Sequence, residues 1–293
     1  TILPDYAGLG NAGVQGYGNR VDTTFSVIDA GRAAATLVGV QPRFIIVGHS
    51  QGGGVALSTQ ALARSYGAPE LELIAAVSIA GNLQFDRTLQ ALRFPGLRIS
   101  GGAGVTLTVT LLALFADWAN VVDEAHAGEV FHAGIRDRVV GSIQSECIYD
   151  IVETVNTASG DYTVPTTIGE IMNPMIREAI VACDMGNDCS HPAEAFVQRR
   201  QNNASPPDAD GAPILMLSGE RDVQSTLERQ ACTRDHLQTA GAPVTTCAFE
   251  DETHFTIVEA SIRHGLSWVE AILLGGDAPT CPEPVVAYPE CSN

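Results

Sequence analysis

The sequence predicts an α/β fold, a mostly parallel sheet with helices on both faces and a large, mostly helical insertion. Short apolar runs rich in β-branched residues, typical of strands buried on both faces, occupy residues 43–47, 71–79, 213–217 and 244–249. Helical patterns alternate with these runs, which is typical of a parallel sheet. The alternation stops in the middle of the chain. We therefore expect an α/β core of residues 1–81 and 213–293, with a cap or lid formed by residues 82–212.

The individual elements follow from local signals. Residues 1–3 resemble the end of a strand, and they lead into a glycine-rich loop at 4–10. A helix is expected over 22–38, with Asp22 or Thr23 as its cap and Gly39 at its end. Further helices are expected over residues 53–66, 225–239 and 257–274.

Composition excludes several kinds of chemistry. The 293 residues, 45% of them hydrophobic, are enough for a large core. All 16 basic residues are arginine, so lysine is absent, and Schiff-base lysine enzymes, P-loop nucleotide hydrolases, kinases and Ser-x-x-Lys acyl-enzymes are excluded. The net charge of −18 argues against nucleic acid or an anionic membrane as a partner. The acidic surplus lies after residue 100.

Cysteine usage favours an oxidising compartment, so we expect a secreted or periplasmic protein. The sequence has no Cys-x-x-Cys pair, the spacing that would favour a zinc site. Proximity suggests the pairs Cys183–Cys189, Cys232–Cys247 and Cys281–Cys291, which leaves Cys147 free or paired outside this chain. The longest apolar stretch, residues 105–116, is shorter than the roughly 20 residues of a membrane span, so no stable membrane insertion is expected.

The strongest motif is Gly48-His49-Ser50-Gln51-Gly52, which matches Gly-x-Ser-x-Gly between a buried strand and a helix. In such an elbow the serine sits at a strained bend, and flanking glycines are expected because a Cβ would clash there. The backbone N–H of Gln51, at the helix N-terminus, is expected to point toward a developing oxyanion. The alternative is an ordinary glycine-rich turn with an incidental serine.

A nucleophilic serine needs a base and an acid that orients the base, in the chain order Ser, Asp or Glu, His. Asp222 follows the strand at 213–217 and is the predicted acid, with Glu220 as its competitor. His254 follows the strand at 244–249 and is the predicted base. His49 is expected to point away from the site. The other histidines are expected to be packed or surface residues.

These residues together carry a resemblance. Residues 3–10, 29–34 and 48–53 resemble the secretory lipase (lipase A-type) family of the α/β-hydrolase superfamily. The resemblance implies a Ser50–His254–Asp222 triad, a cap over an acyl pocket, hydrolysis of small-molecule or lipid acyl esters, and no cofactor. Such folds have further strands ahead of the elbow and a second oxyanion donor in a loop there. We therefore expect the N-terminal strands and that donor to be missing from this chain.

Two other functions remain open: a peptidase or polyester depolymerase with the same triad, and a non-catalytic binding protein of this fold. Gly8 to Gly13 matches Gly-x-Gly-x-x-Gly, but no helix is expected directly after it, so no dinucleotide site is predicted. The acidic turn at 184–188 lacks the spacing of a calcium loop. Apolar residues from Leu107 to Trp118 are expected either to line an acyl channel or to pack the cap.

Overall fold

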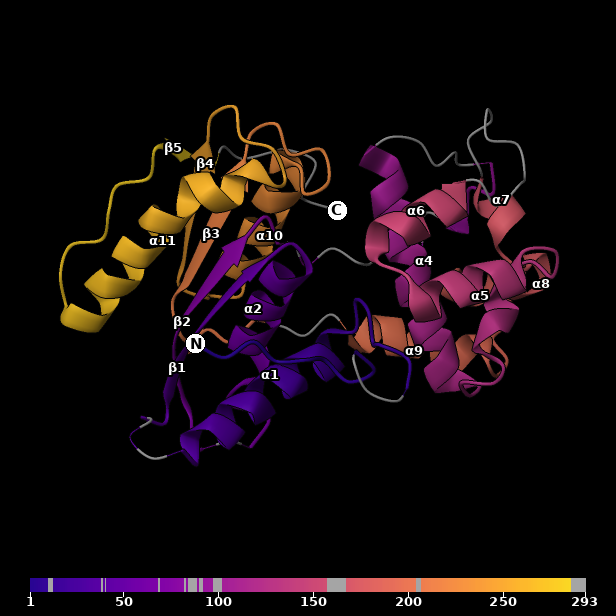
Figure 1. Cartoon of the computed structure of the whole chain (residues 1–293), viewed down its shortest axis with the longest axis horizontal. Coiled ribbons are helices and arrows are strands. Elements are labelled where there is room, and N and C mark those ends of the chain that lie inside the picture. The colour runs from indigo at the N-terminus through magenta and orange to yellow at the C-terminus, as the bar shows by residue number, and fades with distance from the viewer. Residues whose placement is uncertain are drawn as a thin grey trace. The chain divides into compact units, whose positions relative to one another are not determined.

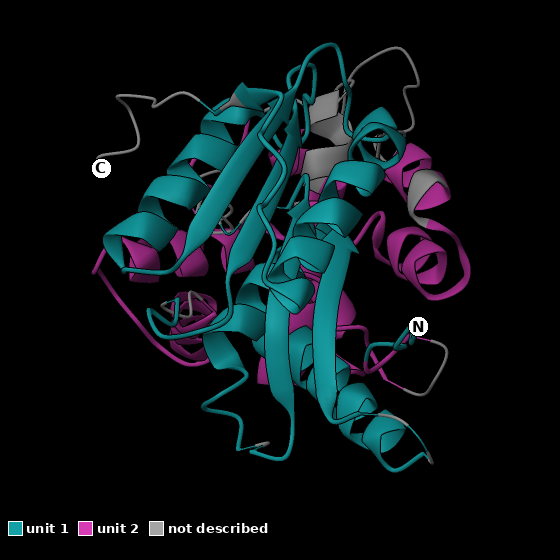
Figure 2. Cartoon of the chain, turned by 90° about the vertical axis from the view of Figure 1, so that its left-hand side faces the viewer, with its two compact units in different colours: residues 1–6, 20–84, 205–293 teal, residues 7–19, 85–204 magenta. Residues whose placement is uncertain are grey.

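The chain divides into two compact units (Figure 2). Unit 1 comprises residues 1–6, 20–84 and 205–293, and unit 2 comprises residues 7–19 and 85–204. The stretch 7–19, which the sequence places in the core, thus groups with unit 2. The computed structural model describes residues 1–9, 13–37, 39, 41–67, 69–81, 83, 89, 92–96, 102–156, 167–203 and 207–285.

Unit 1 contains a five-stranded sheet in the order β1-β2-β3-β4-β5. The strands are β1 (Arg43–His49), β2 (Glu72–Ile79), β3 (Ile214–Gly219), β4 (Val244–Phe249) and β5 (Glu283–Pro284). The first four are parallel, and the short β5 runs antiparallel to β4. The predicted mostly parallel sheet is therefore confirmed. Parallel strands direct their carboxyl ends to one edge, which brings the residues after β1, β3 and β4 to the same edge.

Helices cover both faces of this sheet, as the sequence predicts (Figure 1). Side chains alternate along β3: Ile214 and Met216 join a buried cluster with Leu57 of α2, whereas Leu215 and Leu217 join a second cluster on the opposite face. The first cluster is packed by α1, α2 and α10, and the second by α11. These helices are α1 (Arg20–Ala35), α2 (Gln51–Leu62), α10 (Leu227–Thr239) and α11 (Thr256–Leu274).

Two sequence-based expectations about the N-terminal part need correction. Residues 1–6 form no regular structure, so the strand expected at 1–3 is wrong. A strand exists only where a neighbour completes its ladder, and within the described residues β1 pairs with β2 and with no strand on its other side. Helix α1 also begins two residues before the expected helix and ends at Ala35.

Unit 2 is mostly helical, which agrees with the insertion that the sequence predicts. Its elements are α4 (Gly102–Val121), η1 (Ala127–Val130), α5 (Arg136–Ser145), α6 (Ile148–Asn156), α7 (Ile168–Ile171), α8 (Pro174–Asp184) and α9 (Ala193–Asn202). Leu111, Leu114, Phe115 and Trp118 of α4 are buried in the unit's own hydrophobic core. The side chain of Leu107 lies outside the described residues. In the described part of the chain, no helix is both long and apolar enough to cross a membrane.

A buried ion pair joins two helices of unit 2. Asp117 of α4 accepts hydrogen bonds from Arg199 Nε (3.0 Å) and Arg200 Nη1 (2.8 Å) of α9. Asp117 and Arg200 are almost fully buried. Since a buried charge is tolerated only when it is paired, these contacts fix the register of α9 against α4.

Candidate functional site

Ser50 lies at the bend between β1 and α2, as the motif predicts. Its backbone has φ 55° and ψ −114°, a strained conformation for a residue with a side chain. Two backbone hydrogen bonds hold the bend: the Ser50 N–H donates to the Ile79 carbonyl of β2 (2.9 Å), and the Ser50 carbonyl accepts from the Gly54 N–H (3.1 Å). The hydroxyl is therefore presented at the carboxyl edge of the sheet.

The glycines around Ser50 are not equivalent, which corrects the sequence-based expectation. A Cβ on Gly48 would lie 2.0 Å from the Gly52 carbonyl oxygen, and one on Gly53 would lie 2.7 Å from Gly81 Cα. A Cβ on Gly52 would meet no atom within 4 Å. The tight positions are thus Gly48, where the elbow folds on itself, and Gly53, where α2 crosses the end of β2. At Gly52 the structure leaves room for a Cβ, so glycine is not required there.

Asp222 follows β3 and is buried. Its Oδ1 accepts the backbone N–H groups of Gln224 (2.8 Å) and Ser225 (2.7 Å), which form a short turn around the carboxylate. Burial raises the pKa of this carboxyl, but hydrogen bonds from His254, Ser225 and Gln224 outweigh burial, so the pKa lies below its ordinary value. Asp222 is therefore a carboxylate with one oxygen occupied by the backbone and the other directed at His254.

His254 lies between Asp222 and Ser50 and is buried. Its Nδ1 is 2.8 Å from Asp222 Oδ2, and its Nε2 is 2.9 Å from Ser50 Oγ. Because the carboxylate only accepts, the neutral ring carries its proton on Nδ1 and offers the Nε2 lone pair to the Ser50 hydroxyl. Unit 1 thus brings together the three residues that the sequence singled out, and Glu220 is exposed instead.

The loops that carry Asp222 and His254 are joined to each other by backbone contacts. The Glu252 carbonyl accepts from the Arg221 N–H (2.8 Å), and the Phe249 carbonyl accepts from the Glu220 N–H (3.1 Å). A Cβ on Gly219 would lie 2.4 Å from the Glu252 carbonyl oxygen, so only glycine permits this approach. Arg221 and Asp251 add an exposed ion pair between the same loops. The Asp222–His254 geometry is therefore built into the paired loops.

Gln51 is the first residue of α2, where the leading N–H groups have no acceptor within the helix. Its backbone N–H stands next to the strained Ser50, the position expected of an oxyanion donor. Its side-chain Nε2 is buried and finds no hydrogen-bond partner among the described residues.

His49 contradicts the expectation that it points away from the site. Its Nε2 lies 2.6 Å from the backbone carbonyl of His254, and the two imidazole rings have centroids 4.8 Å apart. Burial lowers the pKa of His49, although the hydrogen bond to His254 opposes this shift. Sequence reasoning missed the contact because the two residues are 205 positions apart.

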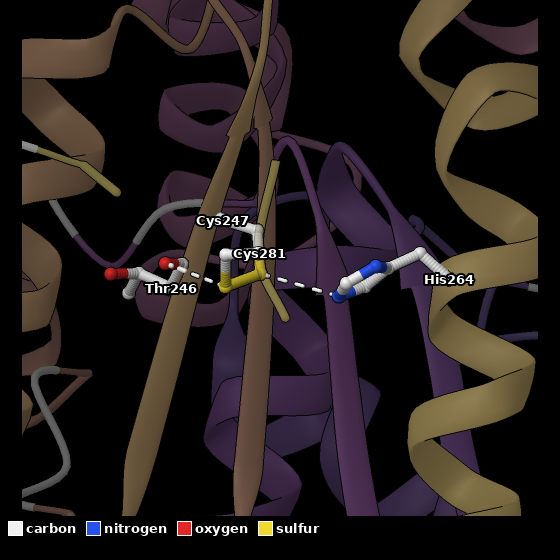
Figure 3. Close-up of a disulfide and its surroundings, with 4 residues drawn as sticks. All are labelled: Thr246, Cys247, His264 and Cys281. Carbon is white, nitrogen blue, oxygen red and sulfur yellow. Dashed lines mark hydrogen bonds between the residues drawn. A yellow bond between two sulfur atoms is a disulfide. The ribbon is translucent and has the colours of Figure 1, made fainter. Parts of the chain in front are cut away.

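A separate cluster holds the only three metal-ligating side chains that the described residues bring within reach of one another: Cys247, His264 and Cys281 (Figure 3). His264 Nε2 lies 3.4 Å from Cys247 Sγ, and burial lowers the pKa of His264. The two sulfurs are joined in a disulfide, so neither is available as a thiolate ligand.

The disulfides correct two of the three pairings expected from proximity. Cys183–Cys189 is present. Cys247 pairs with Cys281, across β4 and the segment before β5, so the pairs Cys232–Cys247 and Cys281–Cys291 are wrong. Cys232 is also in a disulfide, and Cys291 lies outside the described residues. Cys147 is free and exposed. Pairing follows strand neighbours in space, which proximity along the chain does not report.

Comparison with known proteins supports the fold. No protein-family model matches the chain, and no curated protein matches its sequence. Among solved structures, Candida antarctica lipase A is similar with a TM-score of 0.66 at 16% identity, covering 94% of this chain and 58% of that one. The rice cell wall degrading esterase LipA from Xanthomonas oryzae is similar with a TM-score of 0.60 at 17% identity, covering 92% of this chain and 68% of that one.

The chain therefore has an α/β-hydrolase fold with a helical insertion, the fold that these lipase and esterase structures share. It spans little more than half the length of Candida antarctica lipase A.

Proposed function

We propose that this chain is a serine hydrolase that cleaves carboxylic esters of small molecules or lipids. One observation carries the proposal: His254 bridges Ser50 Oγ and Asp222 Oδ2 at hydrogen-bond distance, with Ser50 held in a strained elbow. An alcohol is a weak nucleophile until a base accepts its proton, and this arrangement supplies both the base and the acid that orients it. The similarity to lipase and esterase structures supports the ester as substrate class.

The chemistry follows from the positions of the protons. Ser50 Oγ attacks the ester carbonyl carbon while its proton passes to His254 Nε2, and the carbonyl electron pair moves onto oxygen. The Gln51 N–H, at the start of α2, donates to this oxyanion. Collapse breaks the bond to the alcohol, which takes the proton from His254. Water then attacks the acyl-Ser50 ester with His254 again as the base, releasing the carboxylic acid.

Asp222 acts through His254. Its ionised carboxylate accepts the Nδ1 proton, which keeps Nε2 free to accept the proton of Ser50 and stabilises the imidazolium that forms. The lowered pKa of Asp222 keeps it ionised through the neutral and mildly acidic range. The described groups perform every proton transfer in this scheme.

The test is Ser50→Ala, assayed with p-nitrophenyl esters of several acyl lengths. Loss of the nucleophile and its base–acid partnership is expected to lower kcat by about a millionfold. Ser65→Ala, an exposed serine just beyond α2, is the matched control and is expected to keep wild-type turnover. Undiminished ester turnover in Ser50→Ala would overturn the proposal.

Labelling with a fluorophosphonate separates the enzyme from a binding protein of the same fold. Only an activated serine reacts, so the label is expected on Ser50 in the wild-type chain and to be absent from Ser50→Ala. Turnover of peptides or polyesters in preference to small esters would instead favour the depolymerase alternative. We also propose a secreted or periplasmic location, because disulfides such as Cys183–Cys189 persist in oxidising compartments.

A further inference from the structure

The backbone of His254 is held by a side chain that comes from the serine's own strand. His49, the last residue of β1 and the neighbour of Ser50, has its Nε2 2.6 Å from the His254 carbonyl oxygen. A carbonyl oxygen only accepts, so His49 is the donor through Nε2–H. The ring of His49 also lies beside the ring of His254 and that of Phe255, with centroid separations of 4.8 and 6.2 Å.

The start of α11 leaves this carbonyl available. The Ile257 N–H donates to the Thr253 carbonyl, and the Val258 N–H donates to the Phe255 carbonyl. Neither of these N–H groups donates to the His254 carbonyl. A buried carbonyl without a donor is costly, and His49 supplies the donor.

We propose that His49 is a positioning residue for the reaction: by holding the His254 carbonyl, it sets the distance between His254 Nε2 and Ser50 Oγ. The proposal rests on the proposed function. His254 is then fixed at two points, at the ring by Asp222 and at the backbone by His49. Since His49 and Ser50 are adjacent, any shift of the elbow moves the support of the base together with the nucleophile.

His49 must also support His254 without opposing the positive charge that develops on the His254 ring. When His254 accepts the serine proton it becomes an imidazolium, and a second positive ring 4.8 Å away would disfavour it. Burial favours the neutral form of His49, which still carries the Nε2 proton that the carbonyl needs. A neutral donor therefore suits this position better than a permanently charged one such as arginine.

The test compares two substitutions. His49→Phe keeps a ring of similar size but removes the donor, whereas His49→Gln places an amide N–H near the position of Nε2. Because an error of about 1 Å in placement can cost on the order of a hundredfold, His49→Phe is expected to lower kcat by about tenfold to a hundredfold with little change in KM. His49→Gln is expected to recover kcat to within about threefold of wild type. His236→Phe, in the last turn of α10, is the matched control and is expected to leave kcat unchanged.

Thermal unfolding of each variant distinguishes misfolding from misplacement, and a second readout needs no substrate. The low-field proton NMR resonance of the His254 Nδ1 proton, shared with Asp222, is expected to shift or broaden in His49→Phe and to return in His49→Gln. A folded His49→Phe with wild-type kcat and an unchanged resonance would overturn the proposal, as would equal losses in both variants. Failure of the proposed function gives a different result, since the wild type would then be inactive or Ser50→Ala would remain active.

Discussion

Replacing Asp222 with asparagine tests the proton arrangement directly. The Asp222 carboxylate accepts the N–H groups of Gln224 and Ser225 at Oδ1, and the Nδ1–H of His254 at Oδ2. Asparagine has one oxygen and one amide NH₂. The two backbone N–H groups are fixed in their turn, so they keep the oxygen, and the NH₂ faces His254.

The consequence is a reversed tautomer. An NH₂ group donates, so His254 Nδ1 must accept, and its ring proton moves to Nε2, where it faces Ser50. Nε2 then has no lone pair for the serine proton. This substitution in a serine–histidine–aspartate arrangement costs about 10,000-fold in kcat, which corresponds to about 5 kcal/mol of transition-state stabilisation. The fold is expected to survive, because both backbone hydrogen bonds to the side chain remain.

The assay is kcat and KM on a p-nitrophenyl ester for Asp222→Asn beside the control Glu220→Gln. Glu220 is an acid on the same loop, and it is exposed. We expect a nearly intact KM with a greatly reduced kcat for the first variant, and wild-type values for the second. A folded Asp222→Asn within tenfold of wild-type kcat would refute the tautomer argument, and a large loss in Glu220→Gln would point to the other acid.

Three further predictions concern stability. Gly48→Ala should destabilise the fold by at least about 2 kcal/mol, whereas Gly52→Ala should be neutral or stabilise by up to about 1 kcal/mol; urea denaturation measures both, and equal losses would contradict the structure. Folding lowers the pKa of Asp222, so the carboxylate stabilises the folded state above the ordinary pKa of 3.8, and this stabilisation is lost as pH falls through the lower pKa of the folded state. The difference in unfolding free energy between wild type and Asp222→Asn should therefore shrink from pH 7 to pH 3. A constant difference would disprove the linkage. Replacing Cys247 and Cys281 with serine opens a link of sequence separation 34 and should cost about 3–4 kcal/mol relative to the oxidised wild type, measured by urea denaturation; a double variant as stable as the oxidised wild type would contradict this.

Local patterns were sufficient to predict the core elements of unit 1. The apolar run that became β1 and the glycine-rich turn after it specify the elbow, because only a buried strand followed by a tight bend suits those residues. The order Ser50, Asp222, His254 follows the strand ends, and parallel strands bring their ends to one edge. The candidate residues could therefore be selected without coordinates.

Contacts between distant segments could not be predicted in this way. The sequence determined the four parallel strands, the strained serine and the choice of polar residues at strand ends, since each depends on neighbours a few positions away. Only the tertiary structure decided that Asp222 rather than Glu220 contacts His254, that Cys247 pairs with Cys281, and that His49 holds the His254 carbonyl. These outcomes depend on the register between strands and on the direction of side chains in paired loops, which periodicity along one chain does not encode.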